Sequence, residues 1–259
     1  MSWLSRNGEL RKEPKNLLHG CKTIISLAFP YSWKKPVTTD GFEVARYTQP
    51  DRTDYHEELR QRCRGLVGYL NKSFKGMKTR ICIDSVPLLE RSIAVASGVG
   101  FIGKNNMLIV PDYGSYFFLA EILMDAEIPL SSVEIMESAC GSCTRCLEAC
   151  PTGALERPFH LNACRCLSYL TVEYRDILPQ ETGRKMGRCF FGCDRCQEVC
   201  PYNKSGRRGR RALLPSVEAI LAMDKAGFDE KFGRTAFRRA GLEKLKTNIL
   251  AMLKESASR

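Results

Sequence analysis

Two runs of cysteines have the spacing in this sequence that is most specific for a known chemistry. The first run reads C-G-S-C-T-R-C-L-E-A-C-P and the second reads C-D-R-C-Q-E-V-C-P. The first spacing, C-x2-C-x2-C-x3-C-P, is that of bacterial ferredoxins, whose fourth cysteine ligates the other of two clusters. We therefore predict two [4Fe–4S] clusters. The members of the two runs are Cys140, Cys143, Cys146 and Cys150, then Cys193, Cys196 and Cys200.

Zinc and disulfides are the two alternatives for these cysteines. Structural zinc sites usually combine two separated C-x2-C pairs, without a third cysteine at the same spacing. Disulfides would suit an exported chain, but no apolar signal segment follows Met1 and no apolar run approaches the roughly 20 residues of a membrane span. Thirteen cysteines in such a chain favour metal ligation in a reducing compartment. We expect a cytoplasmic protein with no membrane partner.

The second run is one ligand short of the eight that two clusters need. Cys164, Cys166 and Cys189 all lie near enough in the sequence to complete the set. Spacing alone does not choose among them.

Length and charge set wide limits on function. The 259 residues allow one large domain or two modest ones, and the formal net charge is +11. Two oxidised clusters with their thiolates would lower this to about +7, which is still basic. A basic chain favours a polyanionic partner, although many basic proteins bind none. The segment G-R-R-G-R-R at residues 206–211 suits phosphate contacts or, equally, a solvated linker.

An acidic residue follows one of the buried strands that the sequence predicts. Short apolar runs predict strands at residues 23–29, 80–84 and 115–124, and the polar-apolar pattern of residues 54–71 predicts a helix. Asp84 ends its strand just ahead of Ser85 and Pro87, which suit a helix start. The position of Asp84 in the sequence fits an active-site acid and a simple helix cap equally well.

Two further segments have the composition of ligand-contacting loops. Residues 30–50 contain three prolines and four aromatic side chains, so we expect a long loop that lines a ligand. Residues 98–105 come within one residue of the phosphate-binding pattern G-x4-G-K-[ST], with Asn105 in place of the hydroxyl residue. A helix is expected before this loop and a strand after it, the reverse of a phosphate-binding loop. We reject that interpretation but keep a glycine-rich loop close to some other ligand.

At this point the sequence resembles a known family, the epoxyqueuosine reductases. The resemblance rests on C-G-S-C-T-R-C-L-E-A-C-P-T-G-A-L, R-C-L-S-Y-L-T-V-E and F-G-C-D-R-C-Q-E-V-C-P-Y-N. It also rests on I-D-S-V-P-L-L-E-R-S-I-A and G-V-G-F-I-G-K-N upstream. These blocks cover nearly the whole chain in the same order, and common ferredoxins lack the upstream ones.

The resemblance implies a fold, an activity and partners. The fold is α+β with α/β-like character, in three parts. These are a cobalamin-binding domain like that of reductive dehalogenases at 1–130, a ferredoxin-like double [4Fe–4S] domain at 131–203, and a basic linker with a helical C-terminal segment at 204–259. The activity is reduction of epoxyqueuosine to queuosine at the wobble position of tRNA, with cob(II)alamin fed by the clusters. The implied partners are the tRNA anticodon arm and an external one-electron donor such as flavodoxin or ferredoxin. The oligomeric state stays open, with a monomer as the simplest case.

The resemblance also implies roles for individual residues. Asp84 is the expected proton donor, and His56 is expected to be structural because the family holds its corrinoid without a histidine ligand. One cluster takes Cys140, Cys143, Cys146 and Cys200, and the other takes Cys150, Cys166, Cys193 and Cys196. The expected corrinoid contacts are Tyr31, Arg46, Tyr47, Asp54, Tyr55, Asp84, Gly103, Lys104 and Asn105.

The chain departs from the family pattern, and two other functions stay open. Several dozen residues that usually precede the block at residues 3–10 are missing, which would weaken corrinoid binding. The helical repeats that often follow residues 237–253 are also missing, and the loop at residues 47–54 is longer than usual. One alternative function is an iron–sulfur electron-transfer protein that has lost corrinoid and tRNA use. The other is a corrinoid reductase of a small molecule such as an organohalide.

Overall fold

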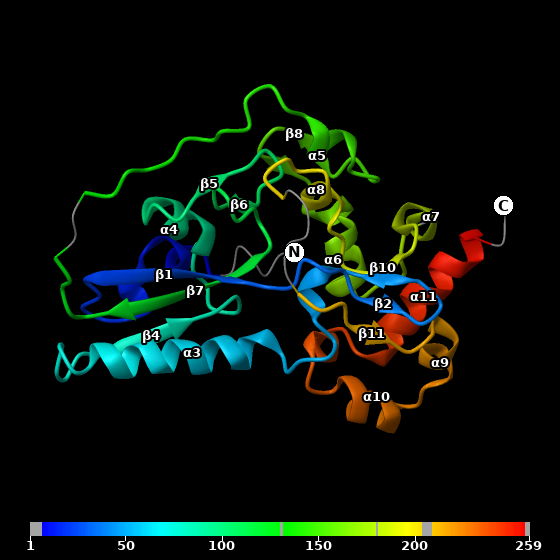
Figure 1. Ribbon diagram of the computed structural model, residues 1–259, viewed down its shortest axis with the longest axis horizontal. Coiled ribbons are helices and arrows are strands. Elements are labelled where there is room, and N and C mark those ends of the chain that lie inside the picture. The colour runs from blue at the N-terminus through cyan, green and yellow to red at the C-terminus, as the bar shows by residue number, and fades with distance from the viewer. Residues whose placement is uncertain (1–6, 130–131, 180, 204–208, 257–259) are drawn as a thin grey trace. The chain divides into compact units, whose positions relative to one another are not determined.

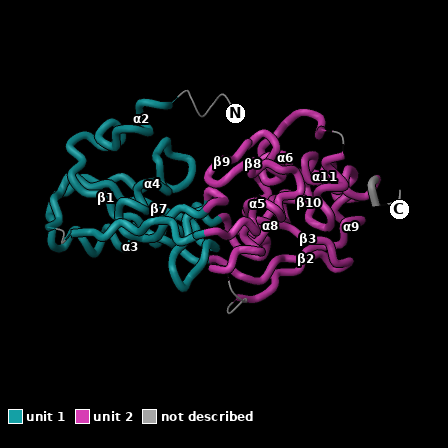
Figure 2. Tube along the Cα trace, turned by 90° about the horizontal axis from the view of Figure 1, so that it is seen from above, with its two compact units in different colours: residues 1–30, 55–103, 107–141 teal, residues 31–54, 104–106, 142–259 magenta. Residues whose placement is uncertain are grey.

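The computed structural model describes residues 7–129, 132–179, 181–203 and 209–256 (Figure 1). The chain forms two compact units (Figure 2). Unit 1 comprises residues 1–30, 55–103 and 107–141, and unit 2 comprises residues 31–54, 104–106 and 142–259. This division differs from the three predicted ranges, because residues 31–54 and 104–106 belong with the cysteine-rich part of the chain.

Unit 1 is built on an antiparallel sheet of three strands in the order β1-β7-β4. The strands are β1 (Thr23–Pro30), β4 (Thr79–Cys82) and β7 (Phe117–Met124). Met124 of the central strand pairs with Thr23 on one side and with Thr79 on the other. All three predicted strands are thus confirmed. The sheet is antiparallel, so the rule that places active sites at the carboxyl ends of parallel strands does not apply to Asp84.

Helices cover both faces of this sheet. The predicted helix is present as α3 (Tyr55–Leu70), whose Leu59 and Cys63 pack with Ile122 and Met124. The side chain of Leu123, between these two, points to the other face and packs with residues before and after β4. On that face lie α4 (Glu90–Ala96), α2 (Gly8–Lys12) and the 3-10 turn η1 (Pro14–Asn16).

The glycine-rich segment forms a hairpin of β5 (Phe101–Ile102) and β6 (Leu108–Ile109). Its turn is closed by the N–H of Gly103, which donates to the carbonyl of Met107 at 2.9 Å. Helix α4 precedes the hairpin and a strand follows, which is the order that excluded a phosphate-binding loop. Residues 104–106 of the turn belong to unit 2.

Unit 2 contains a four-stranded mixed sheet in the order β10-β3-β2-β11. It joins β2 (Val37–Thr38) and β3 (Glu43–Val44) to β10 (Cys189–Phe191) and β11 (Leu213–Leu214). The outer pairs are parallel and the central pair β2–β3 is antiparallel. The predicted loop at residues 30–50 is therefore not a free loop, since both of its strands pair with segments far downstream.

Helices surround an aromatic core in unit 2. Phe190, Phe191, Phe228, Phe232 and Phe237 are all fully buried there. The surrounding elements are α6 (Leu167–Val172), α7 (Thr182–Met186), α9 (Val217–Ala222), α10 (Lys225–Phe232), η4 (Ala236–Arg239) and α11 (Leu242–Ser256). The helical C-terminal segment that the resemblance implies is present as α9, α10 and α11, with a 3-10 turn between the last two.

Helices α7 and α11 approach each other closely at Gly183. A Cβ atom at that position would lie 2.0 Å from the carbonyl oxygen of Ala251, so only glycine fits.

Within the described ranges, no helix is long and apolar enough to cross a membrane. Of the arginine-rich segment, residues 206–208 lie outside the described residues.

Candidate iron–sulfur and catalytic sites

The two cysteine runs fold as an internal repeat. Each contains a one-turn helix, α5 (Arg145–Glu148) and α8 (Arg195–Glu198), and the two helices pack against each other. The same turn follows each helix: Cys150 N–H donates to Leu147 at 3.2 Å, and Cys200 N–H donates to Gln197 at 3.1 Å. A proline comes directly after each of these cysteines and prevents the helix from continuing. The last cysteine of each run therefore lies in a turn after the helix and not in the helix itself.

Cys196 lies near cysteines from both runs. Burial is the main cause of its raised pKa, and the nearby thiol groups of Cys193, Cys166, Cys146 and Cys150 add to the effect. Burial likewise raises the pKa of Cys193 to about 11, with Cys166 again among the neighbours. Residues from both runs and Cys166 thus come together around Cys196.

The two other candidates for the eighth ligand have different surroundings. Cys189 is buried in β10, and its Sγ donates to the carbonyls of Phe191 and Gly192 at 3.6 Å each. Cys164 is exposed in the 3-10 turn η3 (Ala163–Arg165). Cys166 follows that turn directly and is half-buried. Its position among the other cysteines favours Cys166, although Cys193 is also a neighbour of Cys189.

Backbone groups around Cys150 favour its thiolate form. Burial alone would raise its pKa, but hydrogen bonds from the backbone of Leu155, Thr152 and Ala154 and from the Thr152 hydroxyl lower it. Thr152 Oγ1 lies 3.7 Å from the sulfur. Donors of this kind around a thiolate suit a cluster ligand. This segment leads into the hairpin of β8 (Leu155–Arg157) and β9 (His160–Leu161).

The donors that gather around Cys196 are all cysteine sulfurs, which suits an iron–sulfur cluster. Over the described residues, no three His, Cys, Asp or Glu side chains converge closely enough to hold one metal ion. An iron–sulfur cluster asks less convergence of its ligands, because each thiolate binds a different iron atom. The donor set, all sulfur and drawn from two helical turns, therefore fits a cluster. By sequence, Cys140 is assigned to unit 1, whereas the other cysteines of the two runs are assigned to unit 2.

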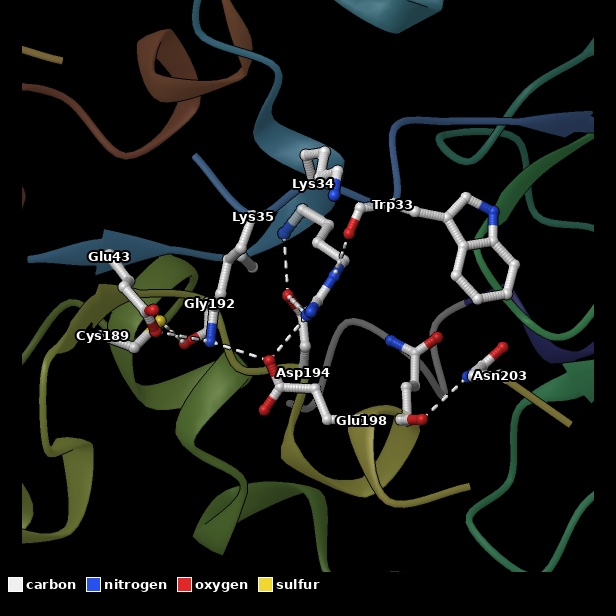
Figure 3. A network of polar contacts seen from close by, with 12 residues as sticks. Trp33, Lys34, Lys35, Glu43, Cys189, Gly192, Asp194, Glu198 and Asn203 are labelled. Carbon is white, nitrogen blue, oxygen red and sulfur yellow. Dashed lines mark hydrogen bonds and ion pairs between the residues drawn. The ribbon is translucent and has the colours of Figure 1, made fainter. Parts of the chain in front are cut away.

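A network of ion pairs holds the second cysteine run from outside (Figure 3). The buried carboxylate of Asp194, the residue before α8, accepts the N–H of Arg46 at 2.8 Å and its guanidinium at 3.1 Å. The same guanidinium donates to Glu198 at 2.6 Å, and its Nε donates to the Trp33 carbonyl at 2.9 Å. Lys35 adds a second cation, 3.0 Å from Glu198.

The two cations of this network offset the effect of burial at Glu198 but not at Asp194. Burial would raise the pKa of Glu198, but Arg46 and Lys35 outweigh it and keep that pKa below its usual range. Burial dominates at Asp194, whose pKa is raised although the same cations act against the shift. Lys35 also lies 3.0 Å from Glu43 at the edge of β3, which ties the predicted loop to α8.

The corresponding positions of the first run have a different environment. Thr144 and Glu148 occupy the places of Asp194 and Glu198, and the Thr144 hydroxyl donates to the Glu148 carboxylate. Both are exposed. Instead, the hairpin turn binds the backbone of both runs: Lys104 Nζ donates to Cys143 O at 3.0 Å, and Asn105 Nδ2 donates to Cys196 O at 3.3 Å. Sequence reasoning did not connect this turn with the cysteines.

Asp84 occupies a strained turn at the end of β4. Its φ angle is +49°, and the N–H of Ser85 donates across it to the carbonyl of Ile83 at 2.5 Å. Helix α4 begins only at Glu90, after Leu89 as its N-cap residue, so the helix start predicted at Ser85 and Pro87 is wrong. Asp84 therefore does not cap this helix, and the simpler of its two interpretations fails.

Aromatic side chains orient the Asp84 carboxylate. The Tyr55 hydroxyl donates to Asp84 Oδ2 at 3.1 Å, and His56 Nε2 lies 3.4 Å from the same oxygen. The Tyr55 ring stacks on Phe118 of β7 and on His56, with centroid distances of 4.0 and 4.1 Å. The Asp84 side chain keeps 47% of its surface exposed, so it is held from one side and open on the other.

Two glutamates, half-buried Glu90 and fully buried Glu121, lie next to this turn. Glu90 Oε1 accepts the N–H of Asp84 at 2.6 Å, and burial, followed by the Asp84 charge, raises the pKa of Glu90 to about 7. Glu121 on β7 is fully buried, and burial, followed by Glu90, raises its pKa to about 8. Ser26 Oγ donates to one Glu121 oxygen at 3.3 Å, while the other has no hydrogen-bond partner among the described residues. A charged residue within the apolar stretch F-F-L-A-E-I-L-M was the available sequence signal, and it was missed.

The expected corrinoid contacts fall in both units. Tyr55, Asp84 and Gly103 belong to unit 1, and the other six belong to unit 2. Tyr31 is buried, Tyr47 packs against the unit 2 core, and Asp54 donates its N–H to the Arg234 carbonyl at 2.7 Å. Gly192, at φ +72°, gives room for Ala45 beside Cys193.

Comparisons with known proteins define first a class and then a family. Residues 139–203 match the 4Fe-4S double cluster binding domain, so this is an iron–sulfur protein of the double-cluster class. Residues 11–85 match the family described as Epoxyqueuosine reductase QueG, DUF1730. The chain is 38% identical to the epoxyqueuosine reductase of Escherichia coli over 98% of its own length and 69% of that protein. The chain belongs to the epoxyqueuosine reductase family and is an oxidoreductase of that kind.

Solved structures agree with this assignment. One is an epoxyqueuosine reductase with an epoxyqueuosine-modified tRNA-Tyr stem loop, 37% identical, with a TM-score of 0.83 over 95% of this chain and 68% of that chain. Another is the Bacillus subtilis enzyme with its catalytic aspartate loop swung out of the active site. It is 35% identical, with a TM-score of 0.83 over 96% of this chain and 68% of that chain.

Proposed function

We propose that this protein reduces epoxyqueuosine to queuosine at the wobble position of tRNA. The observation that carries the proposal is the Asp84 turn. A half-exposed carboxylate is oriented by Tyr55 and His56 and takes no part in capping α4. A carboxyl group held in this way, beside an open space, suits proton donation to a substrate.

Removal of the epoxide oxygen needs two electrons as well as protons, and the clusters would relay the electrons. The grouping around Cys196 and the donors around Cys150 support the proposed ligands. The exchange of the last cysteine between runs is the pattern of two-cluster ferredoxins. We assign Cys140, Cys143, Cys146 and Cys200 to one cluster, and Cys150, Cys166, Cys193 and Cys196 to the other.

Cobalamin, when bound, would supply the metal centre at which the carbon–oxygen bond is broken. His56 faces Asp84, which agrees with a corrinoid site that uses no histidine ligand. Arg46 and Asn105 bind groups of unit 2, so we propose that they shape the wall of the site. The residues proposed to hold the corrinoid are Tyr31, Arg46, Tyr47, Asp54, Tyr55, Asp84, Gly103, Lys104 and Asn105.

The proposed partners follow from charge and from the relatives. A net charge of +11 suits a tRNA anticodon arm, and a relative has been solved with a tRNA stem loop. An external one-electron donor, such as a flavodoxin or a ferredoxin, would reduce the clusters.

Nucleoside analysis of tRNA tests the proposed reaction. Deletion of the gene should leave epoxyqueuosine in place of queuosine, and the gene on a plasmid should restore queuosine. Unchanged queuosine in the deletion strain would contradict the proposal.

The visible spectrum of anaerobically purified protein supplied with cobalamin tests the cofactor. Cluster absorption without cobalamin bands would favour a simple electron carrier.

A further inference from the structure

The turn that carries Asp84 needs something to hold it. A three-residue turn with positive φ at its centre is rare and strained, more so for a residue with a side chain. Asp84 has φ +49°, and the Ser85 N–H closes the turn at 2.5 Å. Such a conformation persists only where surrounding contacts impose it.

The backbone of the turn is held by a half-buried carboxyl group, that of Glu90. Glu90 Oε1 accepts the Asp84 N–H at 2.6 Å, which fixes the backbone at the centre of the turn. Glu90 is the first residue of α4, which packs against β7 and β1. The acceptor is therefore fixed to the rigid part of unit 1 and not to the turn itself.

The side chain of Asp84 is held by a different helix. Tyr55 and His56, in the first turn of α3, both face Asp84 Oδ2, and the Tyr55 ring is fixed by stacking on Phe118. Helices α3 and α4 cover opposite faces of the sheet. The aspartate is thus held at its backbone from one face and at its carboxylate from the other.

We propose that Glu90 is a positioning residue for the reaction: by binding the Asp84 N–H, it holds the aspartate in the strained turn that presents its carboxyl group to substrate. This inference rests on the proposed function of Asp84. The titratable and charged groups near Glu90 are Asp84, Arg91, His56, Cys82 of β4 and Glu121 of β7. Because the pKa of Glu90 lies at about 7, the strength with which it binds the turn changes within the working range of pH.

Two substitutions of Glu90 distinguish the role of its hydrogen-bond acceptor from the role of its charge. Glu90→Ala removes the acceptor, and amides of residues 83–88 should exchange with deuterium about tenfold faster or more in the holoprotein. Its kcat on an epoxyqueuosine-modified stem loop should fall about tenfold or more, with KM unchanged. Glu90→Gln keeps a carbonyl acceptor, so it should retain most of kcat and lose an ionisation near pH 7 from the pH profile.

Asp125→Ala is the matched control. Asp125 Oδ1 accepts the Lys78 N–H at 2.8 Å, the same type of contact at the other end of β4. This variant should speed exchange near Lys78 and leave residues 83–88 and kcat unchanged.

Each readout can overturn the proposal. Unchanged exchange of residues 83–88 in Glu90→Ala would show that Glu90 does not hold the turn, whatever the substrate of the enzyme. Faster exchange with normal kcat would make the contact merely structural. Should Glu90→Ala fail to fold, a Glu90→Gln pH profile identical to that of the wild type would count against the proposal. Failure of the wild-type protein to convert the stem loop would contradict the proposed function, while the exchange experiment would still decide whether Glu90 holds Asp84.

Discussion

Glutamates that are partly or fully removed from water occur in both units, but their neighbours shift their pKa values in opposite directions. In unit 2, Glu198 lies against Arg46 and Lys35, and its pKa is lowered despite burial. In unit 1, burial raises the pKa of Glu90 to about 7 and that of Glu121 to about 8. The neighbours of Glu198 stabilise its charge, whereas the surroundings of Glu90 and Glu121 favour a bound proton near neutral pH.

The difference separates two tasks that the proposed reaction needs. The ion pairs of unit 2 hold the helix between Cys193 and Cys200, two of the proposed cluster ligands. The raised pKa values of unit 1 cluster around Asp84, where protons would be handled. Substitutions in each region should therefore fail in different ways, and this can be measured.

The largest effect is expected from the loss of a cluster ligand. Cys166→Ala should deplete about half of the iron and abolish turnover, because the electron path would be broken. Iron analysis and electron paramagnetic resonance of anaerobic protein measure this. Cys164→Ala, an exposed cysteine two residues away, is the control and should keep all iron. Intact iron in Cys166→Ala would point to Cys189 as the ligand.

Loss of the proposed proton donor should leave the clusters and cobalamin binding intact. Asp84→Asn should lower kcat by about 10²–10⁴-fold while iron content and cobalamin binding stay at wild-type levels. Asp112→Asn is a matched control, since Asp112 is an exposed aspartate of unit 1 with φ +65°. Full activity in Asp84→Asn would remove Asp84 from the reaction.

Removal of the central cation of unit 2 should act on stability. Arg46→Ala leaves Asp194 buried with only part of its compensation, which should cost about 3 kcal/mol. The apparent Tm should fall by roughly 6–12 °C for a domain of this size. Arg62→Ala removes an ion pair of the same 2.6 Å length from the surface of α3, where the cost should be about 0.5 kcal/mol. Equal losses for the two variants would contradict the role of burial in this network.

The smallest effect is expected from Glu121 and depends on pH. The folded protein keeps a proton on Glu121 up to about pH 8, whereas the unfolded chain loses it near the ordinary pKa of 4.5. The free energy of unfolding should therefore fall as pH rises from about 4.5 to about 8. Glu121→Gln should raise the apparent Tm at pH 8.5 by several degrees and have little effect at pH 5, as followed by circular dichroism. Glu127→Gln, at an exposed site nearby, should change neither; a parallel rise in Tm at both pH values would contradict this assignment.

The sequence allowed prediction of features that depend on local spacing. The cysteine runs, α3, the three strands of unit 1 and the C-terminal helices follow from periodicity and turn residues. Features that depend on distant partners were not accessible in this way. Arg46 was expected at a corrinoid, but it binds Asp194 and Glu198. Glu90 was missed because its contacts are with Asp84 in the turn and Glu121 on β7. The spacing of residues along its own helix does not reveal these contacts.

The pairing of β2 and β3 with β10 and β11 has a consequence for synthesis of the protein. Residues 31–54 leave the ribosome early, but the strands that complete their sheet are translated near the end of the chain. At roughly 5–20 residues per second, these two strands would wait on the order of ten seconds for their partners. Unit 1 can assemble its sheet as soon as β7 has emerged, so the cysteine-rich unit should fold last. Delivery of iron and sulfide to the nascent protein would then be useful only after translation is nearly complete.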